Sequence, residues 1–201
     1  MQNNKLMSSS SSLLLVIDAQ KKLMPAIHNS VSILHRSAVL LDVARRMAIP
    51  RVISEHCSNK IGCTLPFISS VAGEHQIIDK THFSVADEPN AMKDIAAYGK
   101  RQLIIVGAEA HICVLQTAMG FASEGFEVFL VKDAIGSRNP DHVDEAIQRA
   151  ALSGIHTVNT EMVIFEWLQR ADSEQFKQSL PVIKRLSSSP DSLEALELLF
   201  G

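Results

Sequence analysis

Six short segments typical of strands, several of them continuous apolar runs, alternate along the chain with longer segments that are typical of helices. The run 13–17, LLLVI, has no polar residue on either face, as expected for a strand covered on both sides. We expect the strands at residues 12–17, 51–54, 75–79, 103–106, 126–131 and 156–159. Strands that alternate with helices pair in parallel, so the pattern predicts an α/β fold with a six-stranded, mostly parallel sheet and helices on both faces.

Helix start and stop signals separate these strands. Asn29 or Ser30 can cap the first long helix, and the Pro at position 50 ends it. Pro89 stands in the first turn of a later helix, and Thr160 caps the one that follows the sixth strand. The expected helices cover residues 30–47, 65–71, 88–98, 141–152 and 160–170, one from about 113 to Gly125, and two more at 173–185 and 192–199.

Composition and charge narrow the class of protein. The 201 residues are 46% hydrophobic, enough for one domain with a substantial core. With 22 acidic and 19 basic residues, no basic excess points to nucleic acid or a membrane surface. The three cysteines, Cys57, Cys63 and Cys113, give no disulfide framework and favour a reducing, cytoplasmic location. We expect a leader at 1–12 without a signal peptide, a domain at 13–186 and a tail at 187–201.

The segment 102–117, QLIIVGAEAHICVLQT, joins the fourth strand to its helix. Gly107 follows the apolar run, and Cys113 then falls in the first turn of the helix. The carboxyl ends of parallel strands are where ligands bind, and a helix N-terminus favours an anion. Such a place can make a thiol nucleophilic. On position alone, a buried and inert cysteine is an equally good interpretation of Cys113.

Two charged residues occupy equivalent places after other strands. Asp18 follows the first strand and Lys80 follows the third, so the carboxyl edge of the sheet can bring both to Cys113. The carboxylate can take the thiol proton, and the ammonium can hold the carboxylate ionised and stabilise a thiolate. We expect Lys80 to outweigh Asp18 and to lower the pKa of the thiol. A turn aspartate and a solvated lysine are the alternatives.

Several motifs together carry a family resemblance. The ordered set LLLVIDAQ, DKTHFS, GAEAHICVLQTA and GFEVFLVKDAIGSR resembles the isochorismatase-like (cysteine hydrolase) superfamily. The segments SEHCSNKIGCTLP and TEMVIFEWL most resemble its isochorismatase-domain-containing branch. The resemblance implies a Rossmann-like, three-layer α/β/α hydrolase fold with an Asp18, Lys80 and Cys113 triad. It also implies a cis peptide at 108–109 and an oxyanion hole formed by the amides of Glu109 and Cys113.

The resemblance also indicates a reaction. Members with the cysteine cleave amide or carbamoyl C–N bonds through a thioester, whereas the isochorismate-cleaving members lack the cysteine. Nicotinamidase members add a metal held by an Asp and two His after the second strand. This chain has Glu55 and His56 there and no Asp-x-His, so we expect no metal and no other cofactor.

We therefore expect a small cytoplasmic hydrolase that acts on a small amide-like molecule, with no nucleic-acid or membrane partner. Gln20, Phe83 and Glu55 are the candidates for binding substrate. Apolar residues on two final helices that are expected to face solvent, together with the resemblance, favour a homo-oligomer. The alternative is a catalytically silent protein of the same fold that binds a metabolite or a protein partner.

Overall fold

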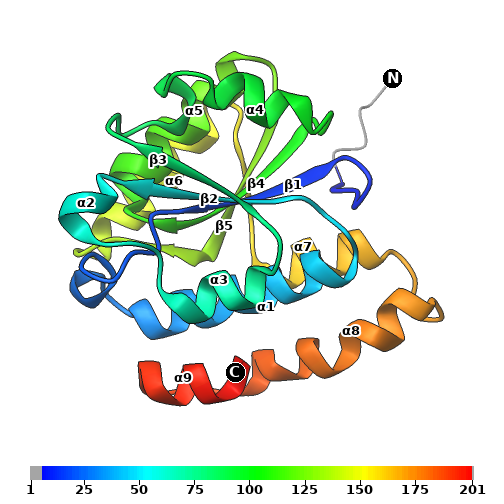
Figure 1. Ribbon diagram of the computed structural model, residues 1–201. Coiled ribbons are helices and arrows are strands. Elements are labelled where there is room, and N and C mark those ends of the chain that lie inside the picture. The colour runs from blue at the N-terminus through cyan, green and yellow to red at the C-terminus, as the bar shows by residue number, and fades with distance from the viewer. Residues whose placement is uncertain (1–5, 201) are drawn as a thin grey trace.

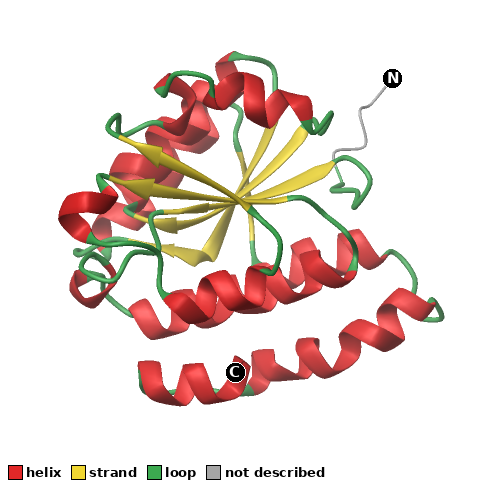
Figure 2. Cartoon of the chain, in the orientation of Figure 1, coloured by secondary structure: helices red, strands yellow, loops and turns green. Residues whose placement is uncertain are grey.

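The computed structural model describes residues 6–200, in which one parallel sheet lies between two layers of helices (Figures 1 and 2). Its strand order is β3-β2-β1-β4-β5-β6, and each pairing between neighbouring strands of this sheet is parallel. The strands are β1 (Ser12–Ile17), β2 (Arg51–His56), β3 (Gln76–Lys80), β4 (Gln102–Ala108), β5 (Glu127–Gly136) and β6 (His156–Val158). The expected α/β fold with six strands is confirmed.

The helices divide between the two faces of the sheet. One face is covered by α1 (Ser30–Arg46), α3 (Pro66–Ala72) and α7 (Thr160–Leu168) (Figure 1). The other face is covered by α4 (Ala91–Ala97), α5 (Leu115–Ser123) and α6 (Asp141–Leu152). The short α2 (Ser58–Ile61) follows β2 at the carboxyl edge of the sheet. None of the described helices is long and apolar enough to cross a membrane.

The position of β1 inside the sheet explains why its sequence is an uninterrupted apolar run. Leu14 and Val16 of β1 pack into the core beneath α1, while Leu13, Leu15 and Ile17 pack into the core beneath α5. Each of these side chains is fully or almost fully buried. Burying one such side chain contributes about 1.5–3 kcal/mol, so both faces of β1 stabilise the sheet.

The last two helices form a further layer on α1. Figure 1 shows α8 (Glu174–Lys184) and α9 (Leu193–Phe200) beyond α1 and α3. Leu196 is completely buried there, and Arg185 lies 3.7 Å from the buried carboxylate of Asp42 on α1. Most apolar residues of these helices therefore pack against the chain's own core, whereas Leu198 is 86% exposed. The expectation that they face solvent was wrong, and they give no argument for self-association.

Boundaries differ where backbone contacts override the residue pattern. Gly107 does not end β4, which continues to Ala108. A Cβ at Gly107 would lie 2.0 Å from the carbonyl oxygen of Ile17, so only glycine lets β1 and β4 approach this closely. Strand β5 runs on to Gly136 through an irregularity in its pairing with β4. At the start of α7 the cap is Asn159, not Thr160.

The start of α4 and the chain ends complete the comparison. Helix α4 begins at Ala91, after a short 3-10 turn at Val85–Asp87, so Pro89 precedes the helix. Of the expected leader, residues 1–5 lie outside the described residues. The amide of Met7, a buried residue, donates to Glu166 on α7 at 2.6 Å.

Candidate active site

Asp18 and Lys80 form a buried ion pair at the carboxyl edge of the sheet. Asp18 directly follows β1, and Lys80 is the last residue of β3. Lys80 Nζ lies 2.8 Å from Asp18 Oδ2, and both side chains are 0% exposed. Removing two charges from water is costly, and an ion pair with this geometry compensates only when further hydrogen bonds satisfy both groups.

Ser54 completes the contacts of the carboxylate. Its hydroxyl donates to Asp18 Oδ1 at 2.7 Å, so each carboxylate oxygen accepts a hydrogen bond from a different side chain. Asp18 adopts a left-handed backbone with φ of 52°, and its amide donates to the Ser54 carbonyl at 3.1 Å. Sequence reasoning did not identify Ser54, although a serine directly after the apolar pair Val52 and Ile53 of β2 was a visible signal.

The Lys80 ammonium also contacts the loop that follows β3. It donates to the carbonyl oxygens of Phe83 at 3.1 Å and His82 at 3.4 Å. With the bond to Asp18, all three N–H groups of the ammonium have acceptors. The ion pair therefore also holds the start of this loop in place.

Cys113 lies beside the ion pair, in a π-helical turn (Ala110–Val114) that connects β4 to α5. Burial, followed by the Asp18 carboxylate, raises the pKa of the thiol from 9.0 to about 12, while Lys80 acts in the opposite direction. The expectation that Lys80 would outweigh Asp18 was wrong. Two unfavourable effects on the thiolate, lost solvation and a neighbouring negative charge, exceed the attraction of the ammonium. At neutral pH the resting residue is a protonated thiol.

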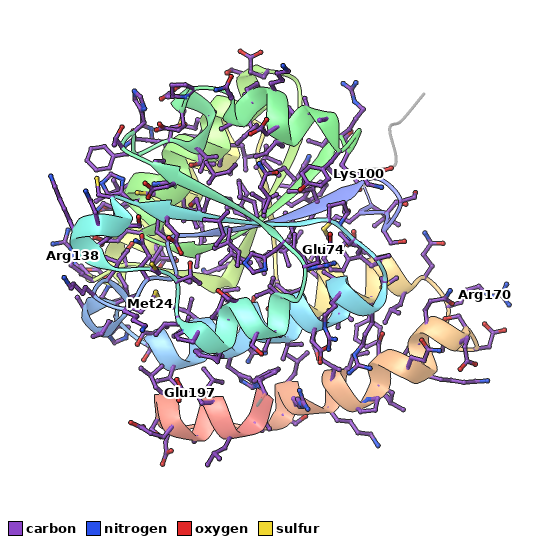
Figure 3. The ribbon with its side chains drawn as sticks, in the orientation of Figure 1. Met24, Glu74, Lys100, Arg138, Arg170 and Glu197 are labelled. Carbon is purple, nitrogen blue, oxygen red and sulfur yellow. The ribbon has the colours of Figure 1, made fainter. Side chains whose placement is uncertain are left out.

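The turn before Cys113 has the backbone geometry that the resemblance implied. The peptide between Ala108 and Glu109 is cis. The Glu109 carbonyl accepts from the amides of Ile112 and Val114, each at 3.1 Å. The Glu109 side chain points to Arg138, whose Nε lies 2.9 Å from it. Figure 3 shows Arg138 at the end of the sheet to which the strand arrows point.

The three candidate substrate residues occupy different environments. Gln20 is fully buried, and its amide accepts from the His56 N–H at 2.8 Å and donates to the His56 carbonyl at 3.1 Å. Glu55 accepts from the Thr64 amide at 2.7 Å. These two side chains thus hold the loop between β2 and α3. Phe83 is 51% exposed and stacks on the His56 ring with 5.3 Å between centroids.

The acidic and imidazole groups of this region do not converge. Within residues 6–200, no three His, Cys, Asp or Glu side chains are grouped to hold a metal ion. Glu55 is directed to a backbone amide and His56 to an aromatic ring. The residues in this region therefore do not fit the metal site of the nicotinamidase members.

Three known proteins show how similar this chain is to others. Isochorismatase domain-containing protein 1 of Danio rerio is 31% identical over 92% of this chain, which spans 65% of that relative's length. The MAR1 ribonuclease of Caenorhabditis elegans is 31% identical, with a TM-score of 0.84 over 93% of this chain and 95% of its own. The YcaC gene product of Escherichia coli, described as an octameric hydrolase of unknown specificity, is 21% identical, with a TM-score of 0.83 over 92% of this chain and 91% of its own.

The family model for the isochorismatase domain matches residues 12–162. That match includes β1 through β6, and with them the three residues at the carboxyl edge of the sheet. The chain therefore belongs to the isochorismatase family and has its hydrolase fold.

Proposed function

We propose that this protein is a cysteine hydrolase that cleaves an amide or carbamoyl C–N bond of a small molecule through a thioester on Cys113. The observation that carries the proposal is the fully buried Asp18–Lys80 ion pair beside a thiol. Stability alone does not explain a buried ion pair, because apolar residues of similar volume often stabilise a fold equally well. Ionisable groups whose pKa is perturbed by burial and by neighbouring charges, as that of Cys113 is, cluster at functional sites.

In the acylation step, Asp18 acts as the base. The Cys113 sulfur attacks the carbonyl carbon while its proton passes to the Asp18 carboxylate. The negative charge that develops on the substrate oxygen is stabilised by the amides of Glu109 and Cys113. The Asp18 carboxyl then returns its proton to the leaving nitrogen, the C–N bond breaks, and a thioester remains. The Lys80 ammonium, 2.8 Å from this carboxylate, balances its negative charge in the buried site.

Hydrolysis of the thioester uses the same carboxylate. Asp18 takes a proton from a water molecule, whose oxygen attacks the thioester carbon. The C–S bond then breaks, the acid leaves, and the proton on Asp18 returns to the sulfur. One residue thus acts as base and acid in both halves of the reaction. Phe83, Gln20 and Glu55 remain our candidates for contacts around the substrate, with Phe83 at the exposed rim.

A panel of small primary amides and carbamoyl compounds tests this proposal. We expect ammonia release from at least one compound, and a covalent adduct on Cys113 that intact-protein mass spectrometry detects after rapid acid quenching. Cys113→Ser should abolish both signals, while Cys63→Ser, at an exposed cysteine, should leave them unchanged. A folded protein that binds a compound of the panel but forms neither ammonia nor an adduct would favour the silent binding protein instead.

The proposal includes a cytoplasmic homo-oligomer that acts on a small molecule. The octameric state described for the YcaC protein supports self-association, and light scattering at micromolar concentration tests it. We do not extend the ribonuclease activity of the relative to this chain. The present chain has 19 basic and 22 acidic residues, so it has no excess of positive charge to bind a phosphate backbone.

A further inference from the structure

A cavity lies at the amino edge of the sheet, where the strands begin. Cys113 lies at the other edge, where the strands end. The cavity has a volume of about 460 Å³, within the range of small-molecule sites. It forms where α1 leads into β2 and where the turn after α3 leads into β3. Its lining comprises Arg45, Ala48, Ile49, Pro50, Arg51, Glu74, His75, Gln76 and Tyr98. In Figure 3, Glu74 lies far from Arg138, which marks the edge that carries the candidate active site.

Arg51 brings a positive charge that no carboxylate neutralises directly. Its guanidinium donates to the carbonyl oxygens of Ile49 at 2.6 Å, Glu74 at 2.7 Å and Ala72 at 2.8 Å. Within residues 6–200, no carboxylate oxygen lies within 4.0 Å of it. Three of its five N–H groups are used, so one on each terminal nitrogen remains for a ligand. Burial, followed by the neighbouring Arg45, lowers the pKa of Arg51, while the Glu74 carboxylate acts in the opposite direction.

His75 adds an unused polar atom to the same cavity. Its Nδ1 lies 2.6 Å from the Gly73 carbonyl oxygen, and because a carbonyl can only accept, Nδ1 carries the proton. The other ring nitrogen, Nε2, is buried and has no hydrogen-bond partner in the described part of the chain. Buried polar atoms nearly always have a partner, so this nitrogen needs one that the chain itself does not provide.

From the cavity, the guanidinium and the unpaired imidazole nitrogen together, we infer a second binding site, for a small molecule that carries a carboxylate or phosphate group. The free N–H groups of Arg51 match the paired oxygens of such a group. The His75 ring lines the same cavity and therefore reports on a ligand bound there. The apolar side chains of Ala48, Ile49 and Pro50 leave room beside the anion for a small apolar body. This site does not depend on the reaction proposed at Cys113.

Nuclear magnetic resonance of the His75 ring, with inorganic phosphate and acetate as separate probes, tests this inference. Sodium chloride keeps the ionic strength constant, and the pH is fixed. We expect at least one probe to shift the His75 ring signals saturably at millimolar concentrations, while chloride alone does not. A shift with phosphate only assigns a phosphate site, and a shift with acetate only assigns a carboxylate site. The absence of a saturable shift with either probe would overturn the inference.

Two variants separate the site from general charge effects. Arg51→Lys keeps the charge but loses the fork of donors, and it should raise the half-saturating concentration about tenfold or more. Arg149→Gln removes an exposed arginine on α6 and should change nothing. If Arg51→Lys does not fold, calorimetric titration of His75→Asn with the same probe replaces it, and heat equal to that of the wild type would refute the assignment.

Discussion

Replacing Asp18 by Asn should make Cys113 more reactive toward iodoacetamide, even as it abolishes turnover. The thiolate is the reactive form, and the rise in pKa from 9.0 to about 12 makes it roughly a thousandfold scarcer at neutral pH. The Asp18 carboxylate is the second largest cause of that rise, after burial. Removing its negative charge also leaves the Lys80 ammonium without its anionic partner, so that the ammonium stabilises the thiolate instead.

The size of the effect follows from the two charges. A neighbouring like charge shifts a pKa by about one to three units, so the Asn variant should alkylate about tenfold to a thousandfold faster at pH 7.5. In the wild-type protein, exposed Cys63 should be labelled before buried Cys113, the reverse of what an acidic nucleophile would give. Lys80→Met removes the favourable charge and should slow labelling of Cys113 further.

Mass spectrometry of peptides from a short alkylation time course measures these rates site by site. Asp79→Asn is the matched control, because Asp79 is an exposed aspartate next to Lys80 in sequence whose carboxylate accepts from the Ser58 amide instead. An Asp18→Asn protein that labels Cys113 no faster than the wild type would refute the electrostatic account. So would a wild-type protein in which Cys113 is labelled first.

Three further predictions concern other parts of the structure. Ser54→Ala should lower kcat/KM about tenfold, because Asp18 loses one of its two side-chain donors. Ser54→Thr keeps a hydroxyl and should recover most of the lost kcat/KM. Steady-state kinetics on a substrate from the amide panel test both variants. Gly107→Ala should destabilise the fold by more than about 2 kcal/mol in urea unfolding, since its Cβ would overlap the Ile17 carbonyl; an unchanged midpoint would contradict this reading of the contact. Burial lowers the pKa of His35 below 6.5, so the neutral ring is favoured on folding, and stability should be fully present above pH 6.5 and fall as the pH drops below it. Thermal unfolding from pH 7.5 to 5 should show a smaller loss in His35→Asn than in the wild type.

The strands that place the candidate site could be predicted because β1 and β4 are apolar runs and β3 fits the regular alternation of strands and helices. Asp18 and Lys80 were located in this way, and parallel pairing put both at one edge of the sheet. The contact with Ser54 could not be predicted, because it depends on the register that pairs Ile17 with Ser54. Apolar runs indicate which segments are strands, but they do not fix which residues lie side by side.

The acidity of Cys113 was missed for a related reason. Sequence shows which charges are available, but the balance between Lys80 and Asp18 depends on how deeply the thiol is buried. Desolvation is the largest cause of the raised pKa, and it depends on packing from several elements at once. The cavity around Arg51 and His75 was equally hidden, since its walls come from three separate segments of the chain.

The bonds from Lys80 to the carbonyls of His82 and Phe83 have a consequence for engineering this protein. The same ammonium that pairs with Asp18 also anchors the loop on which Phe83 stands. Rate and substrate preference therefore cannot be varied independently through Lys80, because any replacement releases the loop as well. A library aimed at new substrates should keep Lys80 fixed. It should randomise Phe83 together with His56, because the rings of these two residues stack on each other.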